Sequence, residues 1–123
     1  MSSILDRFRL DGKVAIVTGA SRGLGAAMAQ ALAEAGADLV LVARGDMAAL
    51  EKSIAALGRR SITVTADVAT PTAAAKIMAA AVAAFGRADI LVNNAGIIRR
   101  AGFLDFTEQD WQEVLDVNLS GAF

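Results

Sequence analysis

The sequence predicts an α/β fold, in which a doubly wound parallel sheet carries helices on both faces. Short β-branched runs alternate with alanine-rich helical segments in the order β-α-β-α-β-α-β-α. That alternation, with right-handed crossovers, is typical of such a sheet. A glycine-rich loop, "TGASRGLG" at residues 18–25, joins the first strand to the first helix. With 123 residues, the chain is expected to form one domain.

The composition is that of a well-packed globular protein. Hydrophobic residues make up 55% of the chain and charged residues 20%, with a net charge of -1, so the charge balance favours neither nucleic acid nor an anionic membrane. No apolar run approaches the ~20 residues of a membrane span. The start "MSSILDRFRLDGK" lacks a signal-peptide pattern, so a cytoplasmic location is expected. Because the chain has no cysteine or histidine, no disulfide and no metal site are expected.

The first β-α unit spans residues 13–36. Residues 13–18, "KVAIVT", read as a strand buried on both faces. A helix is predicted over residues 23–35, with Gly36 at its end. Five apolar residues recur at helical spacing and are expected to form the face that packs on the sheet: Leu24, Met28, Ala31, Leu32 and Ala35.

The second unit follows the same plan. Residues 38–43, "DLVLVA", form the second predicted strand. Asp46 is predicted to cap a helix that runs through Leu57 and is closed by Gly58. Residues 61–66, "SITVTA", are the third predicted strand.

The third helix and the fourth unit complete the pattern. Thr70 is predicted as an N-cap with Pro71 in the first turn of a helix that runs to Phe85. Residues 89–96, "DILVNNAG", form the fourth predicted strand and its turn. "TEQD" at residues 107–110 resembles a capping box with Asp in place of Glu, and opens the last helix.

The glycines of the first loop point to a ligand with phosphate groups. Gly19 permits a tight turn. Of Gly23 and Gly25, one lets a pyrophosphate approach the main chain and the other lets helix and strand pack closely. The free N–H groups of the helix N-terminus can then hold the phosphate charge. The alternative is a structural βα turn that merely needs positive φ.

Two further motifs follow strand ends, where open α/β sheets bind ligands. Asp67 and Val68 come after the third strand, and the carboxylate can accept a hydrogen bond from an adenine amino group. "NNAG" at residues 93–96 follows the fourth strand, and its amides can fix neighbouring loops or a ribose. Alternatively, Asp67 forms or caps a turn, and "NNAG" is only a turn rich in Asn and Gly.

Together these motifs resemble the classical short-chain dehydrogenase/reductase family. The resemblance rests on "TGASRGLG", "ADV" at residues 66–68, "NNAG" and "VNLSG" at residues 117–121, in that order over nearly the whole chain. It implies a Rossmann fold and hydride transfer with NAD(H) or NADP(H). It also implies these cofactor-binding residues: Gly19, Ser21, Arg22, Gly23, Leu24, Gly25, Arg44, Asp67, Val68, Asn94, Ala95 and Gly96.

The catalytic residues of that family are an Asn, a Ser, a Tyr and a Lys. Asn118 matches the Asn, which is implied to hold a water of the proton relay; a helical Asn bonded to local backbone is the alternative. The chain contains no Tyr and stops before the place where the Tyr-x-x-x-Lys pair is expected. Residues 1–123 are therefore interpreted as the N-terminal, dinucleotide-binding portion of a longer enzyme, implied to be a homotetramer. The 123-residue chain alone should catalyse nothing.

"GIIRR" at residues 96–100, followed by "DW", is similar to the branch of that family that acts on sugar acids. Arg99 and Arg100 follow a strand end, where a guanidinium can hold a substrate carboxylate through two parallel hydrogen bonds. The alternative is a solvated loop pair or a subunit contact.

The end of the second strand bears on the choice of cofactor. NAD-preferring members of such folds place an acidic residue there, but this chain has Ala43, followed by Arg44. Arg44 and Arg22 could bracket a 2′-phosphate, so NADP(H) is the expected cofactor. NAD stays open, because Asp46 lies close by and Arg44 can also stack on adenine. A non-catalytic nucleotide sensor or scaffold on the same fold is the alternative function.

Overall fold

The computed structural model describes residues 3–123. Its strands are β1 (Val14–Thr18), β2 (Asp38–Ala43), β3 (Ser61–Thr65) and β4 (Ile90–Val92). Its helices are α1 (Gly23–Glu34), α2 (Ala48–Ala56), α3 (Ala73–Phe85) and α4 (Glu108–Leu115), together with a short 3-10 helix, η1 (Asp6–Phe8), and a π-helical turn, η2 (Asp116–Ser120). The predicted order of elements is confirmed.

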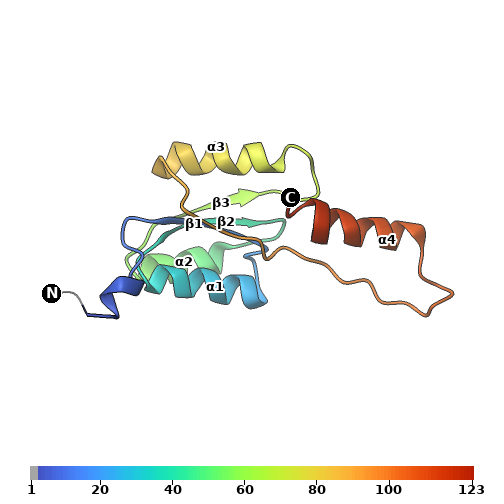
Figure 1. The fold of residues 1–123 in the computed structure, drawn as a ribbon, viewed down its shortest axis with the longest axis horizontal. Helices are drawn as coiled ribbons and strands as arrows, with labels where there is room; N and C mark the ends of the chain where they lie inside the picture. Colours follow the sequence, from blue (N-terminus) through green and yellow to red (C-terminus); the bar gives the residue numbers. More distant parts are fainter. Residues whose placement is uncertain (1–2) are drawn as a thin grey trace.

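The four strands form one parallel sheet in the order β3-β2-β1-β4. Helices α1 and α2 lie on one face of this sheet and α3 lies on the other, while α4 lies to one side, beyond a long loop (Figure 1). The doubly wound α/β prediction is confirmed. The strand order switches sides at β1, because β2 and β3 lie on one side of it and β4 lies on the other, so the loops that follow β1 and β4 lie beside each other at the carboxyl edge.

Two hydrophobic clusters fill the spaces between the layers. Alternate strand residues such as Val17 and Leu41 face α1 and α2, where Ile54 is fully buried. Their neighbours, such as Ile16 and Val40, face α3. All five residues of β1 are buried, which agrees with a strand covered on both faces.

The face of α1 that contacts the sheet differs from the predicted one. Gly25, Ala29 and Ala33 are buried, whereas Leu24 is 76% exposed. Leu32 packs only partly against the core. Small side chains allow the helix backbone to approach the sheet closely, so the larger apolar residues fall beside the contact. The spacing of apolar residues therefore predicted the wrong helix face.

Three helix boundaries also differ. The third helix begins at Ala73, so Thr70 and Pro71 lie before it, and no side chain caps it. The second helix begins at Ala48, whose N–H is held by the Asp46 carboxylate at 2.9 Å. The last helix begins as predicted, with a full capping box between Thr107 and Asp110. It then passes into the π-helical turn instead of continuing as an α-helix.

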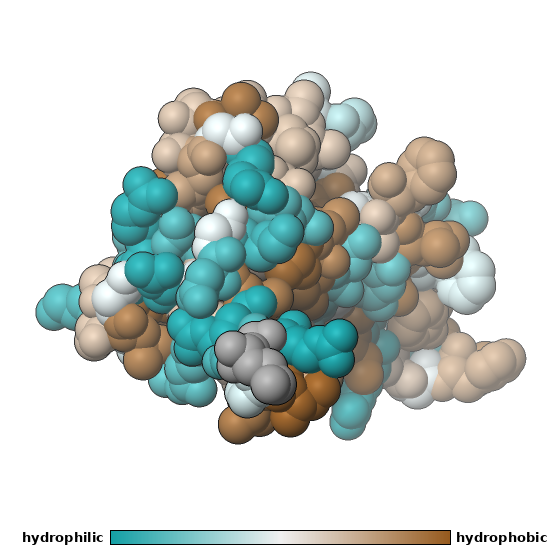
Figure 2. Space-filling model, turned by 60° about the vertical axis from the view of Figure 1, so that its left-hand side comes forward, coloured by the Kyte–Doolittle hydropathy of each residue, from teal (hydrophilic) through white to brown (hydrophobic). Residues whose placement is uncertain are grey.

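Several large apolar side chains are exposed. They include Phe103 and Leu104 in the loop before α4, and Leu91 on β4, the strand at one edge of the sheet. Figure 2 shows brown hydrophobic surface reaching the solvent beside the teal polar surface. Within residues 3–123, no helix has the length and apolar character needed to cross a membrane.

Candidate functional site

The glycine loop between β1 and α1 forms one wall of a cleft. Gly19 has a φ of +64°, and a Cβ there would lie 2.9 Å from Cα of Ala95. Gly25 lies inside α1, where a Cβ would overlap the Gly19 carbonyl oxygen and lie 2.5 Å from Nδ2 of Asn94. Gly23 has a φ of +59°, yet a Cβ there would meet nothing within 4 Å. Two glycines thus serve close packing, and Gly23 leaves open space above the backbone.

Thr18 and Asn94 hold this loop against the end of β4. The Thr18 hydroxyl accepts from the N–H groups of Asn94 at 3.1 Å and Ala95 at 3.0 Å, and donates to the Val92 carbonyl at 3.3 Å. Nδ2 of Asn94 donates to the carbonyl oxygens of Thr18 at 3.2 Å and Gly19 at 3.1 Å. The expectation that "NNAG" fixes a neighbouring loop is met by Asn94. Thr18 carries no local signal of this role in the sequence, because its hydrogen-bond partners lie more than 70 residues away.

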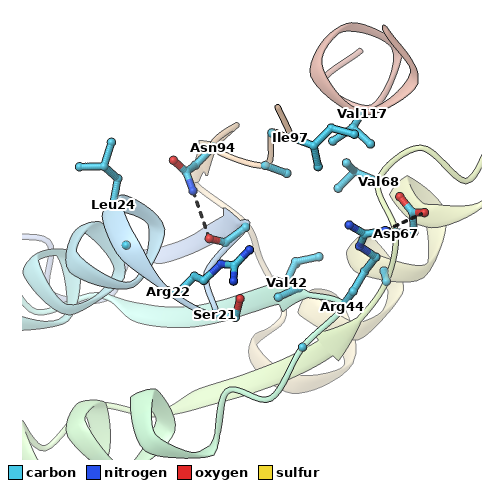
Figure 3. Close-up of a pocket in the computed structure, with 17 residues that line it drawn as sticks. Ser21, Arg22, Leu24, Val42, Arg44, Asp67, Val68, Asn94, Ile97 and Val117 are labelled. Atoms are coloured by element: carbon cyan, nitrogen blue, oxygen red, sulfur yellow. Dashed lines mark hydrogen bonds and ion pairs between the residues drawn. The ribbon is translucent and has the colours of Figure 1, made fainter. Parts of the chain in front are cut away.

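A cleft of about 530 Å³ opens between the loops that follow the strands (Figure 3). All predicted cofactor-binding residues except Gly25 line it, and Gly25 lies behind the loop. The cleft is also lined by residues that were not in the predicted set: Val42, Ala43, Gly45, Ala66, Ile97 and Val117. Strand order explains the gathering, because β1, β2, β3 and β4 are neighbours and all end at this edge.

The charges in the cleft come from Arg22, Arg44 and Asp67. Nη1 of Arg44 lies 3.9 Å from Oδ2 of Asp67. Arg22 extends beside Ser21, on the side of the glycine loop (Figure 3). The N-terminus of α1 has no acidic residue in its first turn and no side-chain cap. This end of the helix therefore presents backbone N–H groups and positive charge to the cleft.

Asn118 lies in the π-helical turn and contacts the loop after β4. Its Oδ1 accepts from the Ile97 N–H at 2.8 Å, and its Nδ2 donates to the Ile97 carbonyl at 2.9 Å. The partner is backbone, as in the alternative reading of a structural Asn, but it is 21 residues distant in the chain rather than local. Ile97 also lines the cleft, so this pair links α4 and η2 to the cleft wall.

Arg99 and Arg100 lie outside the cleft. Arg99 lines a separate groove of about 760 Å³ beside α4, together with Asn118, Phe106 and Trp111. Its Nε and Nη2 both lie 3.2 Å from Oε2 of Glu113. Arg100 is exposed and lines neither space. Glu113 was not predicted as a partner of Arg99, because the spacing of the two residues in the sequence carries no signal before the path of the loop is known. Across residues 3–123, no cluster of potential metal ligands is found.

Comparison with known proteins gives consistent matches. The chain is 45% identical over 120 residues to the 2-dehydro-3-deoxy-D-gluconate 5-dehydrogenase of Dickeya dadantii, a match that covers 98% of this chain and 47% of that protein. A short chain dehydrogenase from Burkholderia cenocepacia, solved in complex with NADP, has a TM-score of 0.87 and 45% identity over 92% of this chain and 47% of its own. One from Mycobacterium paratuberculosis, bound to NAD, has a TM-score of 0.86 and 32% identity over 93% of this chain and 48% of its own.

The chain thus spans about half the length of the relatives it matches. The family model of the short chain dehydrogenases matches residues 13–123, which include the glycine loop, the cleft and the π-helical turn. The chain belongs to the short chain dehydrogenase family.

Proposed function

We propose that this chain is the N-terminal, dinucleotide-binding part of a longer NAD(P)-dependent oxidoreductase that interconverts a ketone and a secondary alcohol. The observation that carries the proposal is the cleft at the carboxyl ends of the strands, bounded by the open glycine loop and the uncapped N-terminus of α1. Open α/β sheets bind ligands at such edges. Half-length coverage of the relatives supports the view that further residues complete the enzyme.

The residues of the cleft fit a dinucleotide. The open space above Gly23 admits a pyrophosphate to the main chain, and the free N–H groups of α1 can hold its charge. Asp67, Val68, Ala95 and Gly96 all line the cleft; we propose that the first two contact the adenine end of the cofactor and the last two its nicotinamide end. The bound nicotinamide ring supplies the hydride or accepts it. Asn94 keeps the glycine loop in place for this binding.

The preferred cofactor is NADP(H). Ala43 lies at the end of β2, where it offers no acceptor to a ribose 2′-OH, and Arg22 and Arg44 supply positive charge to the same cleft. The NADP complex of the Burkholderia cenocepacia relative supports this choice, and the NAD complex of the more distant relative leaves NAD as a second cofactor.

The test is kcat/KM with NADP(H) and NAD(H) for the full-length enzyme before and after Arg44→Ala. We expect a loss of about tenfold to a hundredfold that is confined to NADP(H), because a charge-assisted hydrogen bond contributes roughly 1.5–3 kcal/mol. Arg7→Ala, an exposed arginine outside the cleft, is the matched control and should change neither value. An enzyme that already favours NAD(H), or equal losses with both cofactors, would contradict the phosphate role.

The substrate we propose is a sugar acid, in keeping with the 2-dehydro-3-deoxy-D-gluconate 5-dehydrogenase relative. Arg99 is paired with Glu113, so Arg100 is the better candidate for binding the substrate carboxylate. Arg100→Gln should raise KM for acidic sugars by tenfold to a hundredfold and leave neutral ketones little changed. Arg99→Gln is the comparison, and selective damage to acidic substrates by that variant instead would reverse the assignment.

We propose that Asn118 supports the proton relay indirectly, as a positioning residue beside the cleft wall. Its side chain is bonded to Ile97, so what it contributes is the placement of the π-helical turn against that wall. We further propose that the full-length protein is a cytoplasmic homotetramer.

Extension of the reading frame to find Ser and Tyr-x-x-x-Lys tests the enzyme assignment. A full-length protein without these residues would favour a nucleotide sensor instead.

A further inference from the structure

An ion pair spans the cleft between the ends of two neighbouring strands. Arg44 follows β2 and Asp67 lies just beyond β3, and the register places Ala43 opposite Thr65. The two side chains therefore leave the sheet side by side and meet at 3.9 Å between Nη1 and Oδ2. Figure 3 shows Arg44 turned toward Asp67, with Arg22 on the other side of the cleft.

The carboxylate of this pair is held in place by its own backbone. Oδ1 of Asp67 accepts a hydrogen bond from the Ala69 N–H at 3.0 Å. This bond leaves Oδ2 as the oxygen that faces Arg44. Arg22 lines the same cleft, but none of the ion pairs formed within residues 3–123 includes it. The two arginines are thus unequal, because among residues 3–123 a carboxylate pairs with Arg44 and none pairs with Arg22.

We infer that Asp67 is a specificity-determining residue that weakens the preference for a 2′-phosphorylated dinucleotide by engaging Arg44. The inference rests on the proposed function. A 2′-phosphate must compete with the Asp67 carboxylate for the Arg44 guanidinium, and the carboxylate also repels it directly. NAD has no such phosphate, so its binding does not depend on freeing Arg44. The Arg44–Asp67 pair therefore adjusts the cofactor preference, while Arg22 is a cation of the cleft that pairs with no carboxylate within residues 3–123.

The size of the effect follows from the geometry of the pair. The two side chains are 63% and 40% exposed, and their closest atoms lie at the long end of ion-pair contact. Exposed pairs of this kind change equilibria by roughly two- to fivefold. Asp67 therefore modulates the cofactor preference without reversing it.

The experiment measures Kd for NADP⁺ and NAD⁺ by calorimetry on the full-length protein and its Asp67→Asn variant. Asn keeps an oxygen for the Ala69 N–H, and any adenine contact is common to both nucleotides, so it cancels in the ratio of the two Kd values. We expect the ratio to move toward NADP⁺ by about two- to fivefold at 0.1 M salt. Near 1 M salt the shift should shrink, because the Debye length falls from about 10 Å to about 3 Å.

Two comparisons identify the route of the effect. In an Arg44→Gln background, Asp67→Asn should shift the ratio less, since the arginine that Asp67 engages is gone. Asp46→Asn removes a nearby carboxylate whose Oδ1 already accepts from the Ala48 N–H, and it should leave the ratio unchanged. An equal shift from Asp46→Asn would show a general charge effect and would overturn the inference.

The remaining outcomes are also decisive. Should Asp67→Asn fail to fold, Asp67→Ser provides a second uncharged variant whose hydroxyl can accept from the Ala69 N–H. An unchanged ratio, with both nucleotides bound, would overturn the inference and leave the proposed function intact. If the wild-type protein binds neither nucleotide, both the inference and the proposed function are wrong.

Discussion

Replacing Gly25 by alanine tests how closely the glycine loop is packed. A Cβ at this position would overlap the Gly19 carbonyl oxygen and would lie 2.5 Å from Nδ2 of Asn94. The Gly19 carbonyl and the Asn94 amide are hydrogen-bonded to each other, where the loop after β1 meets the loop after β4. Neither group is therefore the free end of a flexible side chain. The loop must move to accept the methyl group, and Asn94 must then give up its bonds to the Thr18 and Gly19 carbonyls.

The expected loss can be worked from these contacts. Overpacking costs about 1–3 kcal/mol, and the two hydrogen bonds of Asn94 contribute roughly 0.5–1.5 kcal/mol each. Alanine gains about 1 kcal/mol over glycine inside a helix. The net loss in the free energy of unfolding is therefore about 1–5 kcal/mol, and each kcal/mol lowers Tm by about 4 °C for a chain of this length.

Gly23→Ala is the matched control. Its φ of +59° costs an alanine about 1–2 kcal/mol, but its Cβ would enter open space. Thermal and urea unfolding, followed by circular dichroism, should show the larger loss for Gly25→Ala. Gly23→Ala should chiefly weaken nucleotide binding, because the methyl group would occupy the approach to the main chain. A stability loss for Gly25→Ala no larger than that for Gly23→Ala would refute this account of the packing.

Two further predictions concern acid stability and activity. A hydrogen bond from Arg87, and a second one from the Val14 N–H, lower the pKa of Asp89. The Asp89 carboxylate therefore stabilises the fold fully above about pH 4, the usual carboxyl range. This stabilisation is lost as the pH falls through the lowered pKa of the folded protein. Asp89→Asn should flatten this acid limb in urea unfolding measured from pH 6 to pH 2, and an unchanged limb would exclude Asp89 as its source. The isolated 1–123 chain should show no reductase activity, because it has no Tyr. It should also aggregate, because it exposes Leu91 on its edge strand. Robust turnover would show that the acid/base group lies within this chain.

The strands and the loop that bounds the cleft were predictable because their signals are local. β-Branched runs such as "KVAIVT" mark buried parallel strands, and closely spaced glycines before a helix mark the first turn. Parallel order then brings all the loops after the strands to one edge. Most of the residues that line the cleft could therefore be predicted without knowing any side-chain contact, although others, such as Val42 and Ile97, were not in the predicted set.

The contacts that shape the cleft could not be predicted, because they join distant residues. Thr18 bonds to backbone groups more than 70 residues away, and Asn118, within the π-helical turn, bonds to Ile97, which lies 21 residues earlier in the chain. The pairing of Arg99 with Glu113 depends on the path of the loop between them. The prediction of the buried face of α1 was wrong for a different reason. The prediction used the helical spacing of apolar residues, and in an alanine-rich helix several faces satisfy it, whereas close approach to the sheet selects small residues such as Ala29.

The contact between Gly25 and Asn94 also predicts that their effects on stability are not additive. Asn94→Ala alone removes two hydrogen bonds and should cost about 1–3 kcal/mol. In Gly25→Ala those same bonds are already lost, so the double variant counts them once and also has more room for the new methyl group. The loss in the double variant should fall short of the summed single losses by about 1–3 kcal/mol, measured by urea unfolding of all four proteins. Strict additivity would mean that the methyl group never meets Asn94, and that the glycine at this position serves only the carbonyl of Gly19.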